Sequence, residues 1–353
     1  MTASVSRVEQ QPGATANSPW SMPSSAWIQV LKRVYVMIGF HELGLLAAGL
    51  AFFVFLALTP LIAATVMIYG LVGDPAAVQA QMEAIVHLVP SEAAKLIQDQ
   101  LLQIVTTSTG VTGFALVIAL FFAVYGGMRA ASGMISALNI INEEHETRSI
   151  LRLTLRAAAL TLAAVLIALT GLLAGGLFAW LQTQTGVFLG GVTELLFKLL
   201  TWAAAIALGT AGFALIMRYG PDRRPAKWRW LTPGSLLATL LWMLVSFGFS
   251  LYVAYISDYN ATYGSLSAIV VFLMWLFLSA YGVLLGALLN AEIERQTYCD
   301  TTAGPARLPG ERGAVLADQV DDHVPTRDSL ERSKQRHAAH ARRKVSKNAD
   351  SHK

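Results

Sequence analysis

The stretch that decides the fold is 231-LTPGSLLATLLWMLVSFGFSLYVAYI-256, followed after a short polar link by 265-SLSAIVVFLMWLFLSAYGVLLGALL-289. Each run is longer than the roughly 20 residues that an α-helix needs to cross a hydrocarbon core about 30 Å thick. Neither run contains a charged residue. Backbone polar groups in lipid must be satisfied within their own segment, so such runs form helices. The two runs therefore predict a transmembrane helical hairpin.

The composition agrees with a membrane protein. Hydrophobic residues make up 55% of the 353 residues and charged residues only 14%, whereas a soluble domain has about 25% charged residues. The net charge of +4 is uneven, because 11 of the 26 Lys and Arg residues follow Gln296. Cys299 is the single cysteine of the sequence, which excludes an intramolecular disulfide.

Four further apolar runs precede the hairpin, so the sequence predicts an all-α polytopic membrane protein with six transmembrane helices. Pro60 lies well inside the first span, where its missing N–H predicts a kink near Thr59. Both residues, together with Gly126, Gly127 and Gly264, are candidate hinges. The six predicted spans cover about residues 43–71, 111–139, 154–182, 195–217, 231–256 and 265–291.

The Lys and Arg content of the connections predicts the orientation. The segments before span one, between spans two and three, between spans four and five, and after span six are basic. The connections on the other side carry Lys95, with Lys198 just inside span four. Short cytoplasmic loops are enriched in Lys and Arg. Both termini are therefore expected in the cytoplasm.

The segments outside the spans have their own patterns. Residues 1–23 are polar and predict a disordered lead, and residues 296–353 predict a disordered basic tail. Residues 74–110 predict an extracytoplasmic amphipathic segment. The helical part of the membrane domain, residues 24–295, opens with an amphipathic helix suited to the membrane interface. Its apolar positions are Trp27, Val30, Leu31, Val34 and Ile38, with Gln29, Lys32 and Arg33 elsewhere on the helix.

Polar residues near helix ends and breaks are the candidate contacts for a substrate or cavity. Arg129 follows Tyr125-Gly126-Gly127-Met128 in the second span. An arginine there either reaches the headgroups at the membrane boundary or lines a polar cavity and pairs with an anion. The remaining candidates satisfy helix ends, pack between helices or contact a substrate: Asn139, Asn260, Tyr263, Asn290 and Glu292.

Sequence motifs of known catalytic sites are absent. The sequence contains no Gly-rich phosphate loop, no His-Glu-x-x-His motif and no Gly-x-Ser-x-Gly elbow. No two histidines stand at metal-ligand spacing within a span. We therefore expect no catalytic residues, no metal site and no cofactor.

Three motifs resemble the YihY/virulence factor BrkB family of bacterial inner-membrane proteins. They are Trp230-Leu-x-Pro-Gly-x-Leu-x-Ala-Thr-Leu-x-Trp242, Tyr259-Asn-Ala-Thr-Tyr-Gly-Ser-Leu266 and Gly286-Ala-x-x-Asn-Ala-Glu292. The resemblance covers about residues 30–295 and leaves the tail outside. It implies a bacterial inner-membrane location and a link to serum resistance and envelope lipid handling. The ribonuclease BN label often given to this family finds no support here, because a metal-dependent nuclease needs clustered His and carboxylate ligands.

Two functions from different classes follow. The first is a transport or lipid-handling protein whose partners are membrane lipids, including anionic headgroups. The second is a scaffold that recruits envelope proteins through residues 74–110 and the basic tail. An enzyme, including a nuclease, is the weakest alternative, and no specific nucleic-acid partner is expected. The sequence leaves the substrate, the coupling ion and the oligomeric state open.

Overall fold

The structure is a computed structural model that describes residues 11–72, 113–185, 191–256 and 267–319. Within these ranges the regular secondary structure is helical, apart from one isolated antiparallel bridge between Ala226 and Thr302. The elements are η1 (Pro19–Ser21), α2 (Ser24–Phe40), α3 (Leu43–Val72), α6 (Gly113–Ile141), α7 (Ile150–Thr185), α8 (Gly191–Tyr219), α9 (Trp228–Ile256), α11 (Ser267–Glu294) and α12 (Val315–Asp318).

The long helices lie where the apolar runs predict them. Each of α3, α6, α7, α8, α9 and α11 coincides with one predicted span to within four residues at either end. In the described part of the chain, α7, α8, α9 and α11 are long and apolar enough to cross a membrane, and the bent pair α2 and α3 counts as a fifth. The membrane character is thus confirmed, whereas six spans with cytoplasmic termini stay a prediction.

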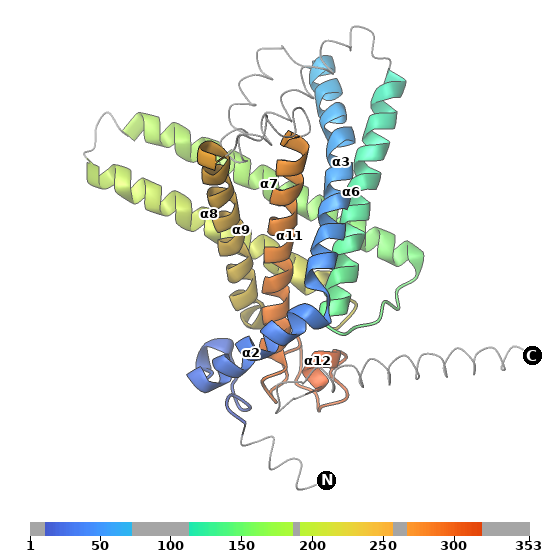
Figure 1. The fold of residues 1–353 in the computed structure, drawn as a ribbon, viewed down its shortest axis with the longest axis vertical. Helices are drawn as coiled ribbons and strands as arrows, with labels where there is room; N and C mark the ends of the chain where they lie inside the picture. Colours follow the sequence, from blue (N-terminus) through green and yellow to red (C-terminus); the bar gives the residue numbers. More distant parts are fainter. Residues whose placement is uncertain (1–10, 73–112, 186–190, 257–266, 320–353) are drawn as a thin grey trace, which may run out of the picture.

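Helix α11 lies at the centre of the bundle. It packs against α9, α3 and α2, while α3 packs along α6 (Figure 1). Helices α7 and α8 contact each other and join the bundle through α6 and α9 respectively. Consistent with its central place, α11 buries the largest share of its apolar stretch among the membrane-length helices. The core cluster gathers around its second half, with Leu284 and Leu288 fully buried.

The chain bends sharply between α2 and α3. The two helices meet at 64°, and Glu42 between them has a φ of 51°. A residue in the left-handed region ends a helix and redirects the chain. Helix α3 continues through Pro60 without interruption. The helix is therefore not unwound near Thr59, and the kink expected there stays a prediction.

Residues 11–23 and 296–319 differ from the disordered lead and tail that the sequence predicts. The hydroxyl of Thr297 donates to the Ala16 carbonyl at 2.8 Å, and the Tyr298 N–H donates to the Ala14 carbonyl at 2.8 Å. Backbone hydrogen bonds order these polar segments where apolar periodicity is lacking. Residues 1–10 and 320–353 lie outside the described residues.

The observed buried face of α2 also differs from the predicted one. Ala26, Val30, Val34 and Met37 are buried, and Arg33 joins them. Arg33 was expected on the polar side, but an ion pair described below compensates its charge. Leu31, which was expected on the apolar side, is exposed. Placement of α2 in the membrane interface stays a prediction.

Candidate functional site

Arg129 lies in a groove between α3 and α6. Its guanidinium carbon is 5.4 Å from the centre of the Phe53 ring, a distance at which a cation and an aromatic face attract. The Arg129 side chain is exposed and, in the described part of the chain, has no carboxylate or hydrogen-bond partner. The groove has a volume of about 290 Å³ and is lined by Leu45, Leu46, Gly49, Leu50, Phe53, Arg129, Ser132, Gly133, Ser136 and Ala137.

The position of Arg129 along α6 bears on whether it reaches the headgroups or lines a cavity. Arg129 precedes Asn139 by ten residues, which is about 15 Å along a helix. Asn139 is buried among the polar contacts at the end of the bundle. An arginine reaches the headgroups only from near a helix end. The groove thus presents a cation about three helical turns inside the bundle from its polar end.

The polar layer, as we name it, is formed by residues 139–149, 218–228 and 292–318 together with residues of α2 and residues 11–16. One part of it contains Asn139. The Asn139 amide donates to Glu146 at 2.9 Å, and its carbonyl oxygen accepts from the Asp222 N–H at 2.7 Å. Arg148 pairs with Asp222 at 2.9 Å and donates to the Gly220 carbonyl at 3.0 Å. Asn139 therefore ties the loop after α6 to the loop after α8.

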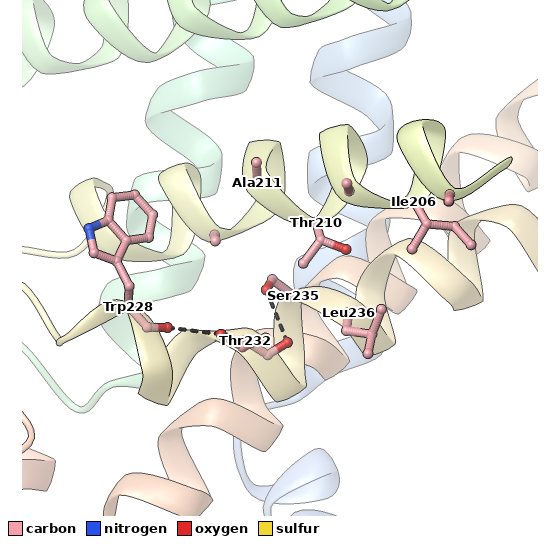
Figure 2. Close-up of a pocket in the computed structure, with 10 residues that line it drawn as sticks. Ile206, Thr210, Ala211, Trp228, Thr232, Ser235 and Leu236 are labelled. Carbon is pink, nitrogen blue, oxygen red and sulfur yellow. Dashed lines mark hydrogen bonds between the residues drawn. The ribbon is translucent and has the colours of Figure 1, made fainter. Parts of the chain in front are cut away.

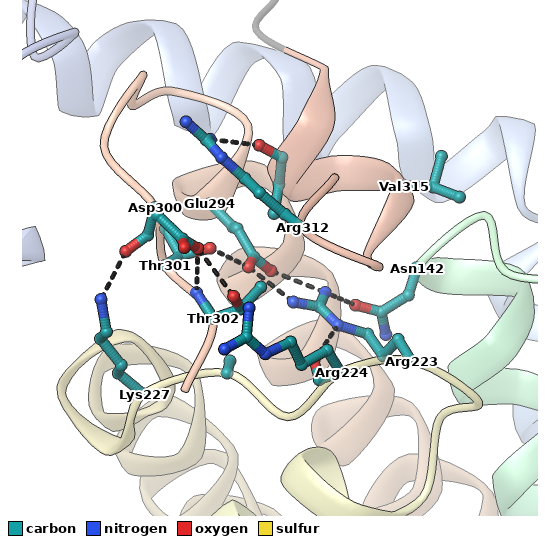
Figure 3. A network of polar contacts seen from close by, with 12 residues as sticks. Asn142, Arg223, Arg224, Lys227, Glu294, Asp300, Thr301, Thr302, Arg312 and Val315 are labelled. Atoms are coloured by element: carbon teal, nitrogen blue, oxygen red, sulfur yellow. Dashed lines mark hydrogen bonds and ion pairs between the residues drawn. The ribbon is translucent and has the colours of Figure 1, made fainter. Parts of the chain in front are cut away.

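A second part of the polar layer centres on Arg223 and Glu294 (Figure 3). Arg223 binds both carboxylate oxygens of Glu294, at 2.6 and 2.7 Å, and both side chains are almost fully buried. Arg223 also donates to Asn142, and the Thr301 hydroxyl donates to Glu294. A bidentate pair with these further bonds fixes the geometry more tightly than one contact would. It joins α11 to the two loops.

The third part connects α2 and the residues before it to the end of α11. Arg33 of α2 pairs with Glu292 of α11 at 2.9 Å and also donates to the Gln296 amide oxygen at 2.6 Å. The Gln296 amide nitrogen donates in turn to the Pro12 carbonyl at 2.7 Å and to Gln29 at 2.9 Å. Glu292, a candidate substrate contact from the sequence, therefore serves a buried structural pair.

Two acidic groups of the polar layer have pKa values that are shifted in opposite directions. Burial raises the pKa of Glu144, although it accepts a hydrogen bond from the Val315 N–H and lies near Arg223. Burial acts in the same direction on Asp222, but hydrogen bonds from Thr147 and Arg148 outweigh it and lower the pKa of Asp222. Asp222 is thus held as an anion, whereas Glu144 gains a proton more easily.

Asn290 lies where α9 and α11 come closest. Its carbonyl oxygen accepts from the Gly234 N–H at 2.7 Å, and its amide donates to the Leu231 carbonyl at 2.9 Å. Gly234 follows Pro233, which has no N–H to donate to the helix. A Cβ on Gly234 would clash with the backbone of Gly286. The side chain of Asn290 therefore completes the hydrogen bonds of α9 beside its proline.

The structure separates the remaining candidates of the sequence analysis. Tyr125 is exposed and stacks on Phe121 one turn before Arg129. A Cβ on Gly126 would lie 2.8 Å from the Ala57 Cα, and one on Gly127 would lie 3.1 Å from Thr161. These two glycines thus allow close packing of α6 against α3 and α7. Asn260, Tyr263 and Gly264 lie outside the described residues.

Sequence reasoning missed most of the polar layer. Arg223 counts only as one of the basic residues between predicted spans four and five, and Asp222 and Glu294 are not among the candidates of the sequence analysis. The alternation of Glu292, Glu294 and Arg295 at the end of α11 was the available signal. In the described ranges, no group of three or more His, Cys, Asp and Glu residues is arranged to hold a metal ion.

Comparisons with known proteins match most of the chain. The family described as virulence factor BrkB matches residues 34–310. The ribonuclease-like protein YfkH of Bacillus subtilis is 26% identical over 75% of this chain and 95% of its own length. UPF0761 membrane proteins of Rhodospirillum centenum and Paraburkholderia xenovorans are 30% and 27% identical over 82% and 70% of this chain. The matches span 61% and 56% of those two proteins. No solved structure matches the chain.

Proposed function

Because this chain belongs to the virulence factor BrkB family of membrane proteins, we propose that it handles lipids with anionic headgroups in the groove at Arg129. The proposed setting is the bacterial inner membrane, with six spans and both termini in the cytoplasm. In this proposal the protein binds and moves lipid without covalent chemistry. The ribonuclease-like name belongs to the Bacillus relative.

The observation that carries the proposal is the exposed, unpaired guanidinium of Arg129 inside a groove. A charge at membrane depth is costly unless it meets a counter-charge, water or headgroups. By contrast, Arg33 and Arg223 of the polar layer are paired with carboxylates. Arg129 has only the face of Phe53 among described groups. A phosphate from a lipid would supply the missing counter-charge.

The shape of the groove is consistent with a lipid headgroup. Gly49 and Gly133 leave room between α3 and α6, and Ser132 and Ser136 add hydroxyl groups beside Arg129. The volume of about 290 Å³ is near the lower end of the range of known small-ligand pockets, about 300–1,000 Å³. The space therefore suits a headgroup rather than a whole lipid.

The test is a scrambling assay with purified protein in vesicles of phosphatidylcholine and fluorescent phosphatidylglycerol, in which dithionite quenches the outer leaflet. Wild-type protein should expose inner-leaflet probe, and Arg129→Ala should abolish the effect. Arg129→Lys should keep part of it, because it retains the charge but loses the planar fork. Arg156→Ala is the control, since Arg156 is an exposed arginine on α7 outside the groove.

Full activity of Arg129→Ala, with folding verified by gel filtration, would exclude this role of the groove. An inactive wild-type protein would favour the scaffold function. That function depends on residues 74–110 and on the tail, most of which lie outside the described residues. Crosslinking of envelope proteins in cells would then be the next experiment.

A further inference from the structure

A second groove lies between α8 and α9, whereas the Arg129 site lies between α3 and α6. It has a volume of about 570 Å³. Figure 2 shows its lining residues from Trp228 at one end to Ile206 and Leu236 at the other. Its walls are formed chiefly by small side chains of α8 and by residues of α9, among them Ala203, Ala207, Ala211, Ala214, Thr232 and Leu236.

The hydroxyl groups in this groove already have hydrogen-bond partners within α8 and α9. Thr232 donates to the Trp228 carbonyl at 3.1 Å, and Ser235 donates to the Thr232 carbonyl at 3.2 Å (Figure 2). Ser235 also donates to the Leu231 carbonyl at 2.9 Å. Thr210 lies 3.3 Å from the Thr239 hydroxyl. These hydroxyls therefore have little need of a polar ligand. The occupant of the groove should be apolar along its length.

The length of the groove matches one leaflet of a bilayer. Its α8 wall extends from Ala203 to Ala214, which is about 16 Å along a helix. One leaflet occupies half of a hydrocarbon core of about 30 Å. The groove begins five residues before the end of α8, next to the polar layer. A lipid chain entering from the headgroup side would fill it.

Arg229 lies next to the end of the groove that is closest to the polar layer. Arg229 follows Trp228 and lies one and two helical turns from Thr232 and Leu236, on the same side of α9. Its side chain is exposed and makes no hydrogen bond or ion pair among the described residues. Arg218 covers the Trp228 ring at 4.6 Å and donates to the Ala226 carbonyl, so it is already engaged. Arg229 is thus the group that can meet an anion.

We propose that the α8–α9 groove binds one anionic phospholipid, with an acyl chain along the alanines of α8 and its phosphate at Arg229. This site shares no residue with the Arg129 groove. The lipid bound here is a stable structural ligand rather than the transported molecule. Trp228 lies at the junction of chain and headgroup, where indole rings are enriched in membrane proteins.

The test uses the full chain in nanodiscs of phosphatidylcholine and phosphatidylglycerol, with retained lipids identified by native mass spectrometry. Wild-type protein should retain one phosphatidylglycerol. Ala207→Phe should lose it, because the ring fills the groove. Ala205→Phe is the matched control, since Ala205 is exposed on α8 but does not line the groove. Arg129→Ala should also retain the lipid, which separates this site from the proposed function.

Arg229→Gln leaves the groove intact and tests the headgroup contact separately. It should reduce the preference for phosphatidylglycerol over phosphatidylcholine about fivefold, as expected for one cation near a membrane surface. This variant also decides the matter if Ala207→Phe fails to fold. Retention by Ala207→Phe, equal loss in Ala205→Phe or an unchanged preference in Arg229→Gln would each overturn the proposal. So would crosslinking of two copies through cysteines placed at position 207 in a Cys299→Ser background.

Discussion

Arg33 and Glu292 are 259 residues apart in the sequence, yet they form an ion pair of 2.9 Å in which each side chain is only 1% exposed. Arg33 also donates to the Glu292 backbone carbonyl and to Gln296. The pair holds the first described long helix, α2, against the last one, α11. It is therefore a sensitive point for stability.

Arg33→Ala should destabilise the protein by about 3–5 kcal/mol, because it leaves the Glu292 carboxylate buried without its partner. The double variant Arg33→Met, Glu292→Leu should regain most of that loss, since it buries no charge. Unfolding by SDS in mixed micelles measures both. Arg156→Ala, at an exposed position of α7, is the control. Equal stability of Arg33→Ala and wild type would show that the pair contributes nothing.

Gly126→Ala should destabilise the contact between α3 and α6 by about 1–3 kcal/mol, as overpacking does. The added Cβ would lie 2.8 Å from the Ala57 Cα, so the backbones must separate. Gly175→Ala is the matched control, because a Cβ there meets nothing within 4 Å. It should be neutral or stabilising by up to about 1 kcal/mol, the helix propensity difference. A hinge role for Gly126 predicts instead a change in activity without a change in unfolding.

Asn290→Ala should cost about 1–3 kcal/mol, since the Gly234 N–H and the Leu231 carbonyl both lose a partner in a buried position. Thermal unfolding in detergent measures the effect. Thr154→Ala is the comparison, because Thr154 only bonds the Ile150 carbonyl on an exposed face of α7. If Asn290 contacts a substrate instead, its loss should lower activity while the unfolding temperature stays the same.

The contribution of Glu144 to the stability of the fold should decline as the pH rises. Burial raises the pKa of Glu144 above its usual 4.5, so the folded state binds the proton more tightly than the unfolded state. Its contribution is therefore complete below pH 4.5 and declines as the pH passes through the raised pKa. The free energy of unfolding, measured in detergent, should fall over this range. Glu144→Gln keeps an acceptor for Val315 and should remove the pH dependence; a persistent dependence would assign it to another group.

Hydrophobic runs were sufficient to predict the long helices. A run such as 265–289 is long enough to cross the membrane, and its backbone N–H and C=O groups can be hydrogen-bonded in lipid only within a helix. The structure has α11 at Ser267–Glu294. The candidates Asn139, Asn290 and Glu292 are buried and hydrogen-bonded, and their role as cavity or substrate contacts stays a prediction. Their partners could not be predicted, because Asp222, Gly234 and Arg33 are distant in sequence and carry no periodic signal.

The ordered ends were missed for a related reason. A polar segment without periodicity predicts disorder because it cannot bury apolar surface. Residues 296–318 are ordered instead by charged and hydrogen-bonding partners, such as Lys227, which donates to the Asp300 carbonyl at 2.7 Å. Gly304, Gly310 and Gly313 adopt positive φ and mark the turns of this segment. These glycines in the sequence were a sign of ordered turns, but the sequence analysis considered only the charge and polarity of the tail.

The contacts of residues 11–16 and Arg33 with residues 292–299 have a consequence for biosynthesis. The amino-terminal partner leaves the ribosome first, whereas Glu292 lies at the end of the last long helix in the described chain and Thr297 follows it. The polar layer can therefore close only after α11 has been inserted with its end on the side of α2. A chain with one helix missing or inverted would leave Arg33 unpaired.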